Sequence, residues 1–304
     1  IIQNNLQEFV STTTLSCTIG GPSTSGNITT TANSPDKFMI FTTVDINHTF
    51  TVPARGINCD ILMIGGGGQS QGEGGGGSGA CIVAINQTLP GGTCVVIVGN
   101  YSNDSFIQVE GIERYRAKAG AFTNAGEGNG KNGGCGSGGN DRSGSDRTGG
   151  APVGTNVVTL PNGSINLSGP TIQPTYAVLG NAGGSSGGVS TGGGGGGIGG
   201  AGASPGKGGD GAYQVTLAGS STPINFKNYF ANGGTFGVDG YIGGGGGGYN
   251  GGYKAGGSGG GANRISGPID AISNTGSGGA YGANAGSGII IIRYRDYYGS
   301  SSSI

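Results

Sequence analysis

The sequence has few of the residues that catalysis, long helices and nucleic-acid binding require. Tryptophan is absent, histidine occurs once, and charged residues make up 10% of the 304 residues, against about 25% in an ordinary soluble domain. A net charge of −1 leaves no basic stripe to displace counterions from nucleic acid. No apolar run approaches the ~20 residues of a membrane helix. We therefore expect neither a nucleic-acid partner nor insertion into a membrane.

The single histidine, His48, restricts the catalytic chemistry of the chain. A Ser-His-Asp or Cys-His arrangement would need this residue as its base, and nothing near it in the sequence suggests activation. Glycine-rich nucleotide-binding patterns match in many places only because glycine is so frequent. Gly130-Lys131 is followed by Asn132, so the phosphate-binding loop pattern fails. We expect no enzyme activity, no cofactor and no metal site.

Five cysteines without a C-x-x-C pair leave two interpretations open. In a secreted chain they predict up to two disulfides and one remaining thiol. The disulfide candidates are Cys17, Cys59, Cys81 and Cys94, and the fifth cysteine is Cys135. Alternatively, the thiols are buried and act as small hydrophobic side chains.

Seven Asn-x-Ser/Thr sequons lie between residues 27 and 168. Occupied sequons would indicate a secreted or surface glycoprotein whose later residues carry no N-linked sugar. The chain begins at Ile1, which fits removal of a signal segment and equally fits a shortened sequence. The candidate sites are Asn27, Asn47, Asn86, Asn100, Asn103, Asn162 and Asn166.

Short runs rich in β-branched and aromatic residues recur along the whole chain, which is typical of β-strands. They predict an all-β protein, a β-sandwich of immunoglobulin-like or jelly-roll-like type. The strand candidates are residues 12–19, 38–44, 48–52, 59–64, 80–85, 94–98, 106–112, 156–160, 176–179, 212–217, 224–230 and 289–298. Residues 94–98 and 289–292 are apolar on both faces, so we expect them in central strands. A turn signal at Leu89-Pro-Gly-Gly92 predicts a hairpin over residues 80–98.

Glycine accounts for 77 residues and is concentrated between these strands. The tracts are residues 65–79, 124–150, 181–211, 232–261 and 274–288. In the third tract, non-glycine residues recur every three positions from Ile198 to Tyr213, and three residues per turn is the period of the polyproline-II helix. We expect ordered glycine-rich loops or polyglycine-II segments, because only glycine permits such close backbone approach. Mobile loops are the alternative.

Two stretches carry a resemblance to a known family. The first runs from Phe50-Thr-Val-Pro-Ala-Arg-Gly56 through Asp60-Ile-Leu-Met-Ile-Gly-Gly-Gly-Gly68 to Val95-Val-Ile-Val-Gly99, and the second is Ala285-Gly-Ser-Gly-Ile-Ile-Ile-Ile-Arg-Tyr294. They resemble the glycine-rich domain of phage tail-fibre and adhesin proteins, large-DNA-virus proteins and bacterial surface proteins. Family members usually carry a further glycine where this chain has Asn100-Tyr-Ser. The resemblance implies a fold and indicates no ligand.

Residues 1–26 predict a strand-forming arm in front of a body formed by residues 27–304. The apolar residues of the arm need a core, either in their own sheet or, by strand donation, at the open sheet edge of a neighbouring subunit. Donation from head to tail would generate an open filament. These assembly candidates are Ile2, Leu6, Val10, Leu15, Cys17 and Ile19.

The expected function is that of a structural subunit of an extracellular, pilus-like filament, with other copies of the chain as its partners. The alternative is a phage or viral tail-fibre adhesin that recognises a cell-surface glycan or protein through its loops. An ice-binding protein is a weaker third class, because the glycine tracts lack a regular threonine-rich face. Four tyrosines set among glycines either stack on sugars or cover glycine backbone: Tyr241, Tyr249, Tyr253 and Tyr281.

Overall fold

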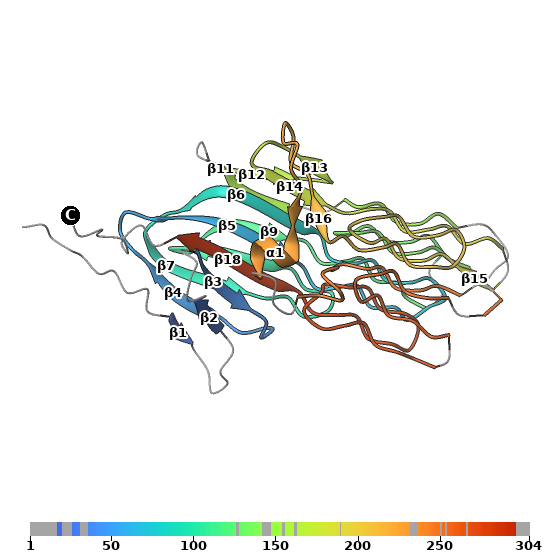
Figure 1. Cartoon of the computed structure of the whole chain (residues 1–304). Coiled ribbons are helices and arrows are strands. Elements are labelled where there is room, and N and C mark those ends of the chain that lie inside the picture. The colour runs from blue at the N-terminus through green and yellow to red at the C-terminus, as the bar shows by residue number, and fades with distance from the viewer. Residues whose placement is uncertain are drawn as a thin grey trace, which may run out of the picture.

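The computed structural model describes most of the chain and shows a β-sandwich with a bundle of glycine tracts projecting from one end (Figure 1). The described residues are 17–19, 26–30, 36–125, 128–141, 147–153, 156–160, 163–188, 190–231, 236–249, 251–252, 254–265 and 267–295. Within them the only helix is the five-residue α1 (Phe226–Phe230), and all other regular elements are strands. The prediction of an all-β protein is confirmed.

Two antiparallel sheets of seven strands face each other in the described part of the chain. In spatial order, the first consists of β1 (Cys17–Ile19), β4 (His48–Val52), β7 (Gly92–Ile97), β8 (Ser105–Val109), β9 (Ile112–Ala117), β11 (Asn156–Leu160) and β12 (Gly163–Leu167). The second consists of β13 (Thr171–Ile172), β14 (Tyr176–Leu179), β6 (Cys81–Leu89), β5 (Ile57–Ile64), β18 (Ile289–Arg295), β3 (Asp36–Phe41) and β2 (Gly26–Thr30). Two short ladders join β10 (Asn140–Asp141) to β15 (Thr191–Gly192) and β16 (Gln214–Val215) to β17 (Ile224–Asn225).

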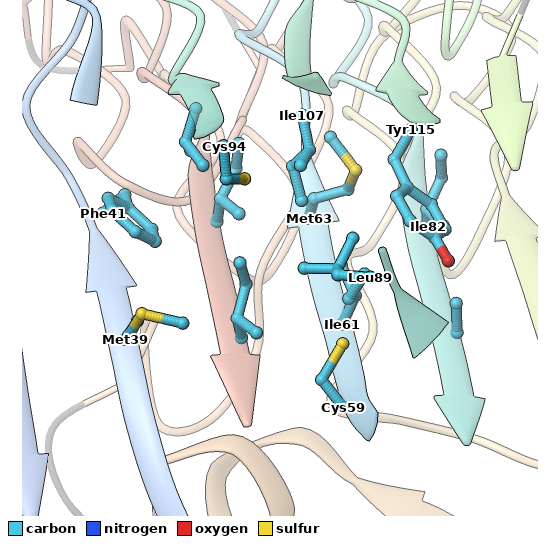
Figure 2. Packing of buried hydrophobic residues seen from close by; sticks show 14 of the residues in the cluster. Met39, Phe41, Cys59, Ile61, Met63, Ile82, Leu89, Cys94, Ile107 and Tyr115 are labelled. Atoms are coloured by element: carbon cyan, nitrogen blue, oxygen red, sulfur yellow. The ribbon is translucent and has the colours of Figure 1, made fainter. Parts of the chain in front are cut away.

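Apolar side chains fill a core on each face of the second sheet. Because side chains alternate along a strand, Ile61 and Met63 of β5 point between the two sheets (Figure 2), whereas Leu62 lies on the outer face. Strand β18 is buried on both faces in the same way. The outer face of this sheet is covered by α1 and by residues around β16 and β17, which complete the second core.

The predicted hairpin over residues 80–98 is wrong. Strand β6 pairs with β5 and β14, whereas β7 pairs with β4 and β8 in the other sheet. The turn at residues 90–91 therefore carries the chain from one sheet across to the other. Both strands direct buried residues, among them Leu89 and Cys94, into the core between the sheets. The same local turn sequence can join two neighbouring strands of one sheet or connect two different sheets. Here the core between the sheets, which both strands share, decides for the second arrangement.

The predicted strand over residues 224–230 is also wrong beyond its first two residues. Asn225 caps α1, because its side-chain oxygen accepts a hydrogen bond from the Asn228 amide at 3.0 Å. Phe226 and Phe230 stand four positions apart, on one face of the helix, and both are fully buried. An asparagine followed by two aromatic residues at i and i+4 is the signal that predicts this helix.

The other strand predictions differ in accuracy. Strands β4, β11 and β14 have the predicted bounds, and β18 is central as expected. The single strand predicted over residues 106–112 is two strands, because Glu110 and Gly111 both have positive φ, 53° and 72°, and turn the chain. The predicted ranges cover the first half of β6 and the first residue of β9, and they include neither β2 nor β12.

The N-terminal arm is described only in part. Its residues Cys17–Ile19 form β1, which pairs with β4 of the same chain in the register Cys17 to Phe50. Ile2, Leu6, Val10 and Leu15 lie outside the described residues. Pairing within the chain is one of the two alternatives considered for the arm, and strand donation stays a prediction.

The described parts of the glycine tracts lie together at one end of the sandwich (Figure 1). Ile64, the last residue of β5, lies opposite both Cys81 at the start of β6 and Ile289 at the start of β18. Leu179, the last residue of β14, lies opposite Cys81. The opposite end of the sandwich holds the turns between β4 and β5, between β6 and β7 and between β8 and β9, together with Arg295, the last described residue of β18. The two ends of the molecule therefore differ: one carries the glycine bundle, with β15 near its far end (Figure 1), and the other carries turns of the sandwich.

Candidate functional site

The first glycine tract lies at the centre of the bundle, and residues 74–80 are buried. Its amides donate hydrogen bonds of 2.8–2.9 Å to three neighbouring segments in turn and then to the same three again. In chain order from residue 75 to residue 80, the acceptors are the carbonyls of Gly193, Gly279, Ala121, Gly196, Gly276 and Lys118. The tract therefore donates to the same neighbouring segment at every third residue. Three residues per turn is the period of the polyproline-II helix, which has no internal hydrogen bonds and can bond to adjacent segments.

The third tract repeats this pattern. The amides of Gly192, Gly195 and Ile198 donate to the carbonyls of Tyr249, Gly246 and Gly243, so that both segments advance by three residues. The spacing that the sequence shows from Ile198 onward has the same period. In residues 207–210 of that stretch the non-glycine side chains are exposed and the glycines between them are buried.

Most glycines inside the bundle have no room for a side chain. A β-carbon at Gly76 would lie 1.9 Å from the carbonyl oxygen of Gly68, and one at Gly150 would lie 1.7 Å from that of Lys131. Favourable contacts between heavy atoms lie at about 3.5–4.0 Å. Only a residue without a side chain fits there, and hydrogen bonds on all sides hold the segments in place. The bundle is therefore a rigid support for the surfaces next to it.

A polar groove of about 480 Å³ lies where the bundle meets the sandwich. Three distant parts of the chain form it: the connection between β3 and β4, the turn after β7, and residues 270–287, which include most of the last glycine tract. We call it the junction groove. It is lined by Thr42, Thr43, Val44, Asn100, Tyr101, Asp270, Ala271, Ser273, Asn274, Asn284, Ala285 and Ser287.

Backbone bonds to the central tract fix the wall of the groove that carries Tyr101. The neighbouring Ser102 amide donates to the Gly67 carbonyl at 2.7 Å, and the Gly66 amide donates to the Asn103 carbonyl at 3.0 Å. A β-carbon at Gly66 would lie 1.7 Å from the Asn100 carbonyl oxygen, so the turn sits directly on glycine backbone. Tyr101 is 45% exposed on this rigid turn.

The opposite wall is held by Asp270 and Asn284. The Asn284 amide donates to Oδ1 of Asp270 at 2.7 Å, and its Nδ2 donates to Oδ2 at 3.2 Å. The Ala271 amide donates to the Asn284 carbonyl at 2.8 Å. Nearby, the Asn274 amide donates to Oγ of Ser287 at 2.9 Å. These bonds define the positions of the polar groups before any ligand arrives.

A second polar cluster lies on the outer face of the second sheet, at the end away from the bundle. Arg293 is bonded to Asp36 through Nε at 3.1 Å and through Nη2, and its Nη1 lies 3.5 Å from Oδ2 of Asp60. The guanidinium also stacks on the ring of Tyr229, whose hydroxyl donates to Asp60 at 2.9 Å. Burial and the neighbouring Asp60 raise the pKa of Tyr229 to about 12. These groups satisfy one another and fasten α1 to the sheet.

The candidate glycosylation sites do not form one surface. Asn47, Asn86, Asn103 and Asn166 are exposed, and Asn100 is half-buried in the junction groove. Asn27 lies in β2, and its side chain is outside the described part of the structure. Asn162 lies outside the described residues.

Four of the cysteines are free and buried: Cys59, Cys81, Cys94 and Cys135. Burial raises the pKa of each thiol, that of Cys94 to about 12 and that of Cys135 to about 11. The disulfides proposed for Cys59, Cys81 and Cys94 are therefore not formed in this structure. These residues instead match the alternative interpretation, in which the cysteines are buried free thiols that pack as small hydrophobic side chains. Cys17 lies in β1, and its side chain is outside the described part.

His48 is 1% exposed. Its Nε2 lies 2.9 Å from the Thr43 carbonyl oxygen, and its ring meets Phe41 edge to face. Among the described residues there is no cluster of three or more potential metal ligands, and no helix is long and apolar enough to cross a membrane.

Of the tyrosines selected from the sequence, the three that the structure describes do not line the junction groove. The ring of Tyr241 contacts that of Tyr213 at a tilt of 50°, and Tyr281 lies beneath the guanidinium of Arg264. Tyr249 contributes backbone bonds to the bundle, and Tyr253 is outside the described residues. Sequence reasoning missed Tyr101, although the departure from the family pattern at Asn100-Tyr-Ser marked this turn. It also missed Asp270 and the other residues of the opposite wall.

No protein-family model matches the chain, and a search of curated proteins finds no match. The resemblance to a glycine-rich domain therefore stays a prediction.

Proposed function

We propose that the chain is an extracellular attachment module, an adhesin whose bundle side faces the surface that it binds. The observation that carries the proposal is the polarity of the fold. The described parts of the glycine tracts lie at one end of the sandwich (Figure 1), and Arg295 of β18 lies at the other. A module of this shape is suited to being held at one end while it presents contacts at the other.

The rigidity of the bundle supports this function. Glycine loses more conformational entropy on ordering than any other residue, so a chain with 77 glycines needs extensive bonding to order them. An ordered surface then binds with little further loss of entropy. The tracts after residue 168 also lack sequons, which would leave their surface free of N-linked sugar.

Exposed apolar side chains near the groove support a contact role for the same face. Ile265, Ile269 and Ile272, which lie two to nine residues before the last glycine tract, are 65%, 49% and 49% exposed. Single exposed apolar residues need no explanation, but grouped ones mark interaction sites.

The test is whether the purified chain binds surfaces or polymerises. Fluorescently labelled chain is added to bacteria, algae, protozoa and cultured animal cells, and binding is measured by flow cytometry. We expect saturable binding to at least one cell type and no filaments by negative-stain electron microscopy. Filaments together with no binding to any cell would overturn the proposal in favour of the filament subunit.

A matched pair of variants tests whether the bundle holds the binding surface. Gly76→Ala places a methyl group against the Gly68 backbone, whereas at Gly200 the nearest atom would be 3.6 Å from the new β-carbon. We expect Gly76→Ala to lose cell binding and Gly200→Ala to keep it. A Gly76→Ala chain that gives the hydrogen-exchange signature of a disrupted bundle and still binds cells would contradict this assignment.

A further inference from the structure

The side chains of the junction groove are of one chemical kind. Eight of the twelve lining residues carry a hydroxyl or an amide, and none is Lys, Arg or His. Hydroxyl and amide groups both donate and accept hydrogen bonds, so they match ligand hydroxyls in either role. The single charged residue is Asp270. A ligand carrying sulfate, phosphate or carboxylate would find no cation there and would face this carboxylate.

Asp270 has acceptor capacity beyond its bonds to Asn284. An ionised carboxylate offers about four lone-pair sites, and Asn284 uses one on each oxygen. Two neighbouring ligand hydroxyls would fill the remaining sites. Hydrogen bonds to charged groups are also the stronger ones. The carboxylate thus favours a ligand with adjacent hydroxyls.

The groove also offers apolar contact. Tyr101 presents an exposed ring on its rigid turn, and Val44, Ala271 and Ala285 are among the lining residues. A sugar ring has an apolar face of C–H groups as well as hydroxyls, and aromatic rings with one wet edge suit such mixed surfaces. The volume of about 480 Å³ lies within the range of about 300–1,000 Å³ typical of small-molecule sites.

We infer that the junction groove binds a neutral carbohydrate, with Tyr101 against the sugar ring and Asp270 accepting from its hydroxyls. The inference rests on the proposed attachment function and names its ligand class and its site. Polar groups held by backbone bonds before binding lose little freedom when the sugar arrives.

A sugar in the groove could also come from the chain itself, as a glycan attached to Asn100. It lines the groove and is also the acceptor of a sequon. A glycan attached to Asn100 would lie at the groove, where it would compete with sugars of another surface. The two sources are distinguished by producing the chain in bacteria, without N-linked sugar, and in a eukaryotic host.

The test is binding of the bacterially produced chain to an array of neutral, sialylated and sulfated oligosaccharides. We expect binding to neutral sugars. Asp270→Asn, which retains an acceptor for the Asn284 amide, and Tyr101→Ala are each expected to weaken it at least about tenfold. The control Tyr281→Ala removes a tyrosine of similar exposure, 39%, outside the groove, and should change the affinity less than about twofold. Thermal unfolding of each variant reports on folding.

The outcomes separate this inference from the proposed function. Binding of both groove variants at wild-type affinity, or binding of charged sugars alone, would overturn the neutral-carbohydrate site. Wild-type chain that binds cells and no array sugar would overturn the site and leave the attachment function standing. In the eukaryotic product, loss of array binding with Asn100 occupied would identify the attached glycan as the ligand of the groove.

Discussion

Replacing Gly76 by alanine is the most direct test of the glycine bundle. Gly76 donates to the Gly279 carbonyl at 2.8 Å and accepts from the Gly246 amide at 2.9 Å, so it joins two other tracts. A β-carbon at this position would lie 1.9 Å from the Gly68 carbonyl oxygen and 2.7 Å from its carbon. These atoms are backbone and cannot rotate away. The segments must separate by more than an ångström.

Two contributions lower the stability of the Gly76→Ala variant. Overpacking a close-packed interior costs roughly 1–3 kcal/mol, and each buried hydrogen bond left unsatisfied costs about 1–3 kcal/mol. With two bonds at Gly76 lost, the free energy of unfolding should fall by about 3–9 kcal/mol. A whole domain is stable by only about 5–15 kcal/mol, so the bundle should open in the variant.

Gly200→Ala is the matched control. Its β-carbon would find the nearest atom, the amide nitrogen of Asp210, at 3.6 Å, and the residue has no positive φ. Alanine should be neutral or should stabilise by about 0.4–1 kcal/mol, because it restricts the unfolded chain.

The assay is urea denaturation together with hydrogen exchange measured by mass spectrometry on peptides from the tracts. We expect fast exchange in Gly76→Ala across residues 65–80 and their partner segments, and wild-type exchange in Gly200→Ala. Equal stability and equal exchange in the two variants would refute the tight packing of the bundle.

Three further predictions concern the buried groups. Alkylation of unreduced protein at pH 8 should leave Cys59, Cys81, Cys94 and Cys135 unlabelled in the native state and label all four in denaturant; failure to label after denaturation would indicate disulfides instead. Because burial raises the pKa of Cys135 from 9.0 to about 11, the unfolded thiol loses its proton first, so stability is full below pH 9 and falls towards pH 11. The slope is up to about 1.4 kcal/mol per pH unit for each such thiol; urea titrations should give a shallower slope in Cys135→Ala, and an unchanged slope would contradict the assignment. Arg293→Met should lower stability by about 3–5 kcal/mol, because it removes the cation beside the buried Asp36 and the partly buried Asp60. Arg116→Met at a half-exposed pair should cost at most about 1 kcal/mol. Similar losses in the two variants would argue against the buried network.

The amino-acid pattern predicts much of the sandwich. β-branched runs locate β4, β11 and β14 to the residue, and apolar character on both faces places residues 289–292 in a central strand. These properties are local, because each depends on how a short segment divides its side chains between two faces. The cap and paired phenylalanines of α1 are equally local, and attention to Asn225 would have corrected the predicted strand.

Which strands pair with each other could be seen only in the tertiary structure. The turn at residues 90–91 reads the same whether it joins neighbours in one sheet or crosses between sheets, and only the common core of Leu89 and Cys94 decides. The same holds for the junction groove, whose residues 42–44, 100–101 and 270–287 are far apart in the chain.

What the sequence by itself determined was the kind of structure each segment forms: apolar strands, and glycine tracts with a three-residue spacing after Ile198. What only the tertiary structure decided was which tract lies against which. Glycine has no side chain that could select a neighbour, so the choice of partner depends on the register of amides and carbonyls across the five tracts. That register exists only when the strands of the sandwich have brought the ends of the tracts together.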